Sequence, residues 1–129
     1  MKVSLDANAY SMLRRGGRSL EQCLAEADEV YISAVVLGEI HAGFLMGTRH
    51  EENLAALDEF LSLPGTEVIP VTRSIAERYG VIVQQLKQQG TPIPTNDIWI
   101  AATALETGTR LVSYDSHFQH VPGLIVLAP

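Results

Sequence analysis

Four carboxylates in this chain lie beside or within apolar segments, at positions where they could bind a metal ion. Asp6 follows an opening apolar segment and Asp115 follows a late one, whereas Glu39 and Asp97 belong to largely apolar helical stretches. Carboxylate oxygens are the ligands that hard divalent cations select, and such cations activate water and polarise phosphoryl oxygens. If the four side chains converge, we expect an oxygen-rich metal site.

Glu39 is the most informative of these acids when each is taken alone. On a helix, the residues one turn away from it are apolar or small: Val35, Val36, Ala42 and Gly43. A carboxylate on that stripe must be neutral, paired from another element or bound to a cation, because an isolated buried charge is costly. We therefore favour a functional role for Glu39.

The other three acids each have an ordinary structural explanation. Asp6 is a suitable N-cap for a following helix, and Asp115 is a suitable turn residue. Asp97 falls in the first turn of a helix that Thr95 or Asn96 could cap, and acids are common there. Their assignment to a site depends on whether the fold brings all four acids together.

The pattern of apolar segments and breakers predicts alternating strands and helices. This alternation indicates an α/β domain with a mainly parallel five-stranded sheet and helices on both faces. Nothing in the sequence indicates a linker or a repeat, so residues 1–129 are expected to form a single domain. The predicted strands cover residues 2–5, 30–32, 67–71, 110–114 and 124–127, and the predicted helices cover residues 7–14, 19–27, 34–46, 51–63, 73–89 and 95–107.

This order of elements places all four acids at one edge of the sheet. Asp6 and Asp115 directly follow strands, so they lie at the carboxyl edge, where parallel sheets bind ligands. Helices run antiparallel to the strands, so Glu39 lies about two turns into a helix that starts at that edge. Asp97 lies at the start of the helix that precedes the strand 110–114. Because that helix runs antiparallel to the strand, its start lies at the same edge. A chance meeting of four unrelated acids at one edge is less probable than a shared site.

Composition limits the classes of function. The formal net charge is −6, which argues against a broad basic surface for nucleic acid, although bound cations would offset part of it. The single Cys23 cannot form an internal disulfide, and the opening MKVSL runs into Asp6 before any long apolar stretch. We expect a cytoplasmic protein with no membrane segment.

Several polar residues near the acids have roles that the sequence leaves open. Asn8 follows Asp6 closely and could orient a carboxylate or a water, and Ser116 and His117 follow Asp115 and could touch a phosphate. His117 and His120 have a spacing seen in zinc sites, but no cysteines complete such a set, so zinc is disfavoured. The basic run RRGGR, residues 14–18, is favoured as a solvated loop over a phosphate contact.

Three segments of the sequence resemble the PIN-domain ribonucleases, and among them the VapC-type toxins of toxin–antitoxin pairs. VSLDANAYSML is similar to the family's opening strand with its metal-binding Asp, and SAVVLGEIHAGF is similar to the helix that carries its Glu. The longest match is NDIWIAATALETGTRLVSYDSHFQHVPGLIVL, with an acid, a small-residue helix, a strand and a second acid. One departure is Ala7, where many relatives carry a hydroxyl residue.

The resemblance implies a PIN-like three-layer sandwich and a Mg²⁺- or Mn²⁺-dependent endoribonuclease. It assigns the metal site and the catalysis to the following residues: Asp6, Glu39, Asp97 and Asp115. It further implies an RNA substrate, neutralisation by a VapB-type antitoxin, contact with operator DNA only through that antitoxin, and a homodimer that can enter a larger toxin–antitoxin assembly.

The residues themselves leave rival functions to be weighed. A phosphatase with a nucleophilic first-strand Asp usually has a second Asp two residues later, where this chain has Asn8. A phosphoacceptor receiver domain needs a Lys after a late strand, and the segment 114–117 offers none. The remaining alternative is a non-catalytic PIN-like module whose acidic rim binds a basic peptide.

Overall fold

A five-stranded parallel sheet forms the centre of the molecule, which a computed structural model describes over residues 1–129. The strand order is β3-β2-β1-β4-β5, and every neighbouring pair is parallel. The predicted mainly parallel sheet is therefore confirmed, with no antiparallel strand. The strands are β1 (Lys2–Leu5), β2 (Glu29–Ser33), β3 (Thr66–Ile69), β4 (Arg110–Val112) and β5 (Val126–Leu127).

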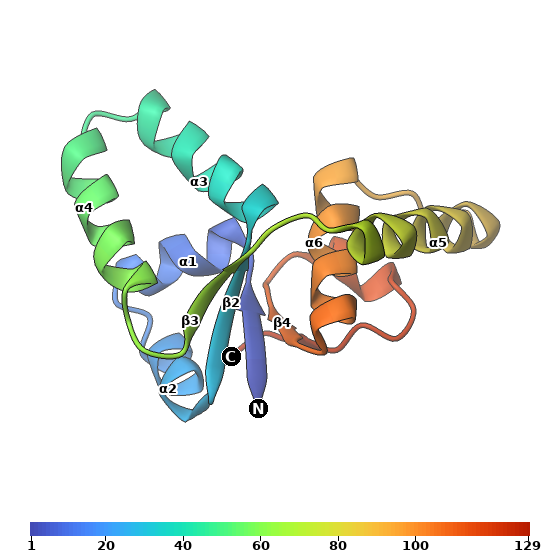
Figure 1. Cartoon of the computed structure of the whole chain (residues 1–129), viewed down its shortest axis with the longest axis horizontal. Coiled ribbons are helices and arrows are strands. Elements are labelled where there is room, and N and C mark those ends of the chain that lie inside the picture. Colours follow the sequence, from blue (N-terminus) through green and yellow to red (C-terminus); the bar gives the residue numbers. More distant parts are fainter.

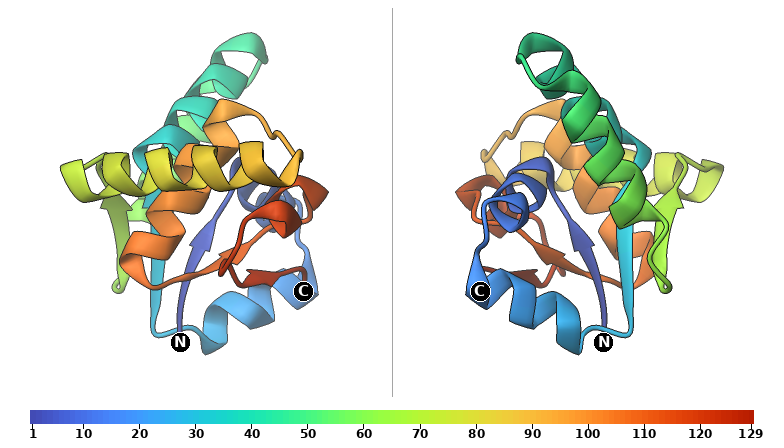
Figure 2. Two further views of the ribbon diagram at one scale, coloured as in Figure 1. Left: turned by 90° about the vertical axis from the view of Figure 1, so that its right-hand side faces the viewer. Right: turned by 90° about the vertical axis from the view of Figure 1, so that its left-hand side faces the viewer.

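Helices cover both faces of this sheet, which confirms the three-layer architecture. Helices α1 to α4 lie on one side and α5 and α6 on the other (Figure 1), and the two side views show each group in front of the strands in turn (Figure 2). None of the helices is both long and apolar enough to cross a membrane. The helices are α1 (Ala7–Arg14), α2 (Arg18–Glu26), α3 (Ala34–Met46), α4 (His50–Leu61), α5 (Arg73–Gln89), α6 (Thr95–Thr107) and the short 3₁₀ helix η1 (Ser116–His120).

The central position of β1 brings the first and last acids of the sequence next to each other. Leu5 at the end of β1 pairs with Val112 at the end of β4. The Asp6 N–H continues this pairing by donating to the Val112 carbonyl at 3.4 Å. The segments that follow the two strands therefore leave the sheet side by side.

Alternating side chains on β1 and β4 anchor both helix layers. Val3, Leu5 and Val112 are buried and pack with residues of α1 and α2. Leu111, the neighbour of Val112, belongs instead to the larger core shared with α5 and α6. Because both faces of the central strands are covered, their carboxyl ends are held firmly, and the residues that follow them inherit fixed positions.

Side chains cap α3 and α5 but not α6. The hydroxyls of Ser33 and Thr72 accept hydrogen bonds from amides in the first turns of α3 and α5. Helix α6 instead begins after Pro94, whose carbonyl accepts the first helical hydrogen bond from Ile98, and no side chain caps it. The predicted capping by Thr95 or Asn96 is wrong, because both residues lie inside the helix.

A short 3₁₀ helix after β4 was not predicted from the sequence. Strand β4 ends at Val112, and the chain turns through Tyr114 into η1. The only buried residue of η1 is Phe118, which is 1% exposed and belongs to the larger core. This anchor fixes the loop that carries Asp115.

Candidate metal centre

The four acids singled out from the sequence line one small pocket at the carboxyl edge of the sheet. The pocket has a volume of about 110 Å³, and Asn8 also lines it. Its acids come from four different segments: the start of α1, the middle of α3, the first turn of α6 and the start of η1. The structure therefore brings together the following predicted residues: Asp6, Glu39, Asp97 and Asp115.

Asp6 acts both as a helix cap and as part of this pocket. One carboxylate oxygen, Oδ1, accepts a hydrogen bond from the Ala9 N–H at 2.8 Å, which caps α1. The other, Oδ2, accepts a hydrogen bond from the Ser113 hydroxyl. Burial raises the pKa of Asp6 and the nearby Asp115 charge adds to this, whereas the bonds from Ser113 and Ala9 oppose the rise. The two interpretations of Asp6 are therefore compatible.

Ser113 is a residue of the centre that sequence reasoning missed. It is 1% exposed, its hydroxyl donates to Asp6, and its oxygen accepts the Asp115 N–H at 3.0 Å. Ser113 thereby ties the ends of β1 and β4 together. The available signal was a polar residue near the end of the predicted strand 110–114, at the edge where the acids were already expected.

Substituting Ser113→Ala should weaken divalent-cation binding by about tenfold to a hundredfold, as the loss of a group that orients a metal ligand does elsewhere. Without the Ser113 bond, the pKa of Asp6 rises further. Because a cation binds the ionised carboxylate, the acid limb of the pH–activity profile should move to higher pH. Calorimetric titration with Mn²⁺ and a pH series measure these effects. The exposed Ser116→Ala is the matched control, and unchanged Mn²⁺ affinity in Ser113→Ala would contradict the assignment.

Glu39 is half-buried and has no basic partner in the pocket. Burial raises its pKa, and the negative charges of Asp97 and Asp6 raise it further. The only opposing contribution comes from the nearby Asn96 side chain, which favours the ionised form. The sequence argument, that no ordinary salt bridge neutralises Glu39, therefore agrees with the structure.

Asp97, Asp115 and His117 form the tightest group in the centre. The His117 Nδ1 atom lies 3.1 Å from Asp97 Oδ2 and 3.1 Å from Asp115 Oδ1. One potential ligand atom from each of the three residues lies within 4.8 Å of the others. Burial raises the pKa of Asp97, and the His117 contact opposes that rise. Asp115 Oδ1 also accepts the His117 N–H at 2.9 Å, so the predicted turn role of Asp115 coexists with its place in the pocket.

The donor set fits a hard divalent cation. The pocket combines four carboxylates with the amide of Asn8, and no Lys or Arg lines it. Burial disfavours the charged forms of Asp6, Glu39 and Asp97, and no basic side chain of the pocket compensates for it. A bound cation would lower the free-energy cost of ionising these three acids. His117 adds one nitrogen, but His120 is absent from the group and no cysteine is near, which disfavours zinc.

Comparison with known proteins agrees with the interpretation drawn from the sequence. The PIN domain pattern matches residues 4–124 of this chain. Ribonuclease VapC2 of Rickettsia felis is 32% identical over 106 residues, which cover 81% of this chain and 78% of the relative. Ribonuclease VapC2 of Haemophilus influenzae is 31% identical over 115 residues, which cover 88% of this chain and 86% of that relative.

A solved structure extends this similarity to the fold. A chain in the crystal structure of VapBC2 from Rickettsia felis bound to a promoter DNA fragment superposes with a TM-score of 0.86 at 29% identity, covering 98% of both chains. The chain therefore belongs to the PIN-domain family and, within it, to the VapC group.

Proposed function

We propose that the chain is a metal-dependent endoribonuclease toxin that hydrolyses RNA phosphodiester bonds and is neutralised by a VapB-type antitoxin. The observation that carries the proposal is the convergence of four carboxylates in a pocket without a basic side chain. The relatives named Ribonuclease VapC support the reaction class. The VapBC2 complex on promoter DNA supports a partner antitoxin, with DNA contacted through the complex.

In this proposal each acid has a separate role, which its position in the pocket supports. Asp6 and Asp97 would hold Mg²⁺ or Mn²⁺, and Asp115 would complete the site for a second cation or its water. Glu39, with its pKa raised by burial, either ligates or takes a proton from the attacking water. The cation, when bound, supplies charge stabilisation and a more acidic water. The hydrogen bonds from Ser113 and Ala9 keep the Asp6 oxygens oriented throughout.

Divalent cations should stabilise the folded protein in a pH-dependent way. The raised pKa values of Asp6, Glu39 and Asp97 mean that the folded state keeps protons that the unfolded state has lost. Stability of the metal-free protein therefore falls as pH rises from the ordinary carboxyl pKa to the raised values, and then levels off. Cation binding needs the ionised acids, so stabilisation by Mn²⁺ grows across the same window. At one hundred times the dissociation constant it should reach about 2.7 kcal/mol.

Thermal unfolding with Mn²⁺, with Mg²⁺ and with chelator, at a series of pH values, measures this stabilisation. A melting temperature that is insensitive to both cations above the window would contradict a metal centre in this pocket.

RNA cleavage distinguishes the enzyme from the non-catalytic module that binds a basic peptide. Purified, antitoxin-free protein incubated with total RNA should produce defined fragments with Mn²⁺ and none with chelator. Peptide binding without chelator-sensitive cleavage would favour the module. Mapping the ends of the fragments would then identify the RNA class and the cleaved sequence.

A further inference from the structure

Three arginines that line pockets around α1 form no salt bridge with a carboxylate. Of the nine Lys and Arg residues, only Lys2, Arg73 and Arg78 form salt bridges with carboxylates. Of the others, three line pockets around α1: Arg14, Arg15 and Arg49. An RNA strand must bring phosphates close to four carboxylates in a chain of net charge −6, so it needs local positive charge nearby.

A first pocket adjoins the metal centre directly. It has a volume of about 350 Å³ and shares Asn8 and Asp115 with the acidic pocket. Beyond these shared residues, its lining includes Arg15 and Tyr114. An RNA strand with one phosphate among the acids would therefore pass next into this pocket, which offers one arginine and one aromatic residue.

Tyr114 is suited to contact a base. Its side chain is anchored at the hydroxyl, which donates to the Pro129 carbonyl at 2.8 Å. The residue is nevertheless 40% exposed and directly precedes Asp115. Exposed aromatic rings are the usual stacking platforms for bases of single strands. The anchored hydroxyl reduces the freedom that the ring would lose on stacking.

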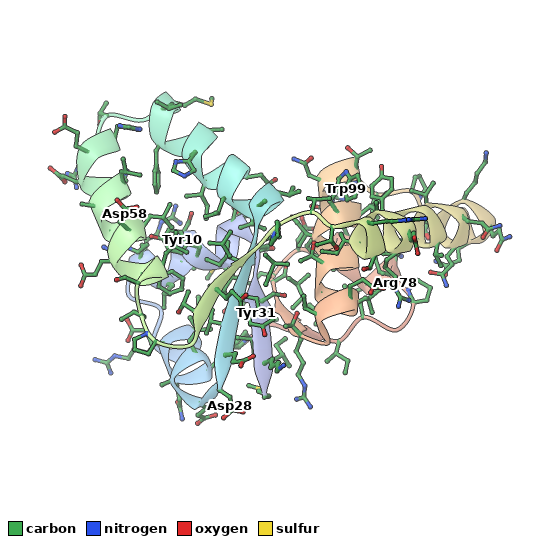
Figure 3. The ribbon with its side chains drawn as sticks, in the orientation of Figure 1. Tyr10, Asp28, Tyr31, Asp58, Arg78 and Trp99 are labelled. Atoms are coloured by element: carbon green, nitrogen blue, oxygen red, sulfur yellow. The ribbon has the colours of Figure 1, made fainter.

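A second pocket continues on the far side of Arg15. It has a volume of about 490 Å³ and shares Arg15 and Ser11 with the first pocket. Arg14, Arg49 and Asn53 also line it, and no Asp or Glu does. Tyr10 lines it too, between α1 and α4 (Figure 3), and its buried hydroxyl has no hydrogen-bond partner in the chain. These groups are donors, as an anion site requires.

We propose that the RNA strand runs from the metal centre along α1, with one base stacked on Tyr114 and successive phosphates held by Arg15 and then by Arg14 and Arg49. We call this set of four residues the α1 track. The proposal rests on the proposed function, since it takes RNA to be the substrate. It deepens that function by assigning residues that bind the strand on one side of the cleaved bond.

Salt-dependent RNA binding tests the track apart from cleavage. The affinity of the antitoxin-free protein for a fluorescently labelled single-stranded RNA is measured in chelator over a series of NaCl concentrations. Each of Arg14→Ala, Arg15→Ala and Arg49→Ala should reduce the slope of log affinity against log salt by roughly 0.7, the value for one lost phosphate contact on a single strand. With Mn²⁺ added, the same variants should raise KM with little change in kcat.

The matched control is Arg110→Ala. Arg110 is exposed and begins β4, so it lies at the edge of the sheet opposite the acidic pocket. Its substitution by Ala changes the net charge by the same amount as the other three variants do. A slope for Arg15→Ala that equals the slope for Arg110→Ala would overturn the proposal. So would variants of Arg14, Arg15 and Arg49 that bind RNA normally but bind a VapB-type antitoxin more weakly, because the track would then belong to a protein partner.

The contribution of Tyr114 to RNA binding is tested with two further variants. Tyr114→Ala should weaken RNA binding by about tenfold or more without changing the salt slope, because stacking involves no counterion. Tyr114→Phe keeps the ring and should retain most of the affinity. Equal losses in both variants would refute stacking. If wild-type protein binds RNA with the predicted dependence but shows no chelator-sensitive cleavage, the proposed function fails and the track remains as a binding site.

Discussion

Asp97→Asn should lower metal-dependent RNA cleavage by about a thousandfold or more, while the metal-free protein remains as stable as the wild type or becomes more stable. The loss of activity follows because a metal ion contributes several kcal/mol of charge stabilisation and each 1.36 kcal/mol corresponds to a tenfold change in rate. Asn has the same shape as Asp but carries no charge, so the cation loses a ligand without a cavity being formed.

Asp97→Asn should not destabilise the metal-free protein, because the surroundings of Asp97 disfavour its charged form. Burial raises its pKa, and the charges of Asp115 and Asp6 add to the effect. An acid with a raised pKa destabilises the folded state at pH values above that pKa, so removing its charge relieves repulsion at neutral pH. The one loss is the contact with His117, which a neutral amide can replace with a hydrogen bond.

Two measurements on the same protein samples separate these effects. Cleavage is followed with Mn²⁺, and denaturant unfolding is followed with chelator. Asp58→Asn is the control, because Asp58 is exposed on the α4 helix, away from the acidic pocket (Figure 3), and should change neither quantity. Wild-type cleavage by Asp97→Asn would sink the assignment of a metal ligand, and a large loss of stability would show a structural role instead.

Phe118→Ala should reduce the free energy of unfolding by about 3–5 kcal/mol, the usual cost of truncating a buried Phe. Phe118 is the largest fully buried side chain of the protein, and it is the only buried residue of η1. Without this anchor the turn that carries Asp115 and His117 is free to shift. We therefore expect the Mn²⁺ affinity to fall as well, although Phe118 does not line the acidic pocket.

Urea unfolding and Mn²⁺ titration measure the two consequences. Phe118→Leu should lose less than Phe118→Ala in both, because it refills most of the space. Leu45→Ala, at a residue that is 71% exposed, should stay within about 0.5 kcal/mol of the wild type. A stability loss below about 1 kcal/mol in Phe118→Ala would show that η1 is not anchored through this side chain.

The placement of the acids was predictable because it depends on chain direction alone. Once strands and helices alternate in a parallel sheet, Asp6, Glu39 and Asp115 have to lie toward its carboxyl edge. Periodicity and breakers were sufficient to identify these elements. The apolar neighbours of Glu39 also identified it as an unpaired acid, and the raised pKa agrees.

The details that the sequence did not predict depend on contacts between distant segments. The bond from Ser113 to Asp6 joins residues 107 positions apart, and no local pattern encodes it. Helix α6 begins after Pro94 rather than with a polar cap, because a carbonyl from the preceding turn accepts the first helical bond. Helix η1 forms because Asp115 caps it and Phe118 is buried beneath it, which only the packed core determines.

The direction of the helices also affects the repulsion among the four acids. Helices α1, α3 and α6 all begin at the carboxyl edge, where the acidic pocket lies. Each helix carries about half a positive elementary charge at its amino end, so three such ends face the same cluster. These partial charges are built into the backbone and cannot dissociate. The backbone of the fold thus offsets part of the mutual repulsion among the clustered acids.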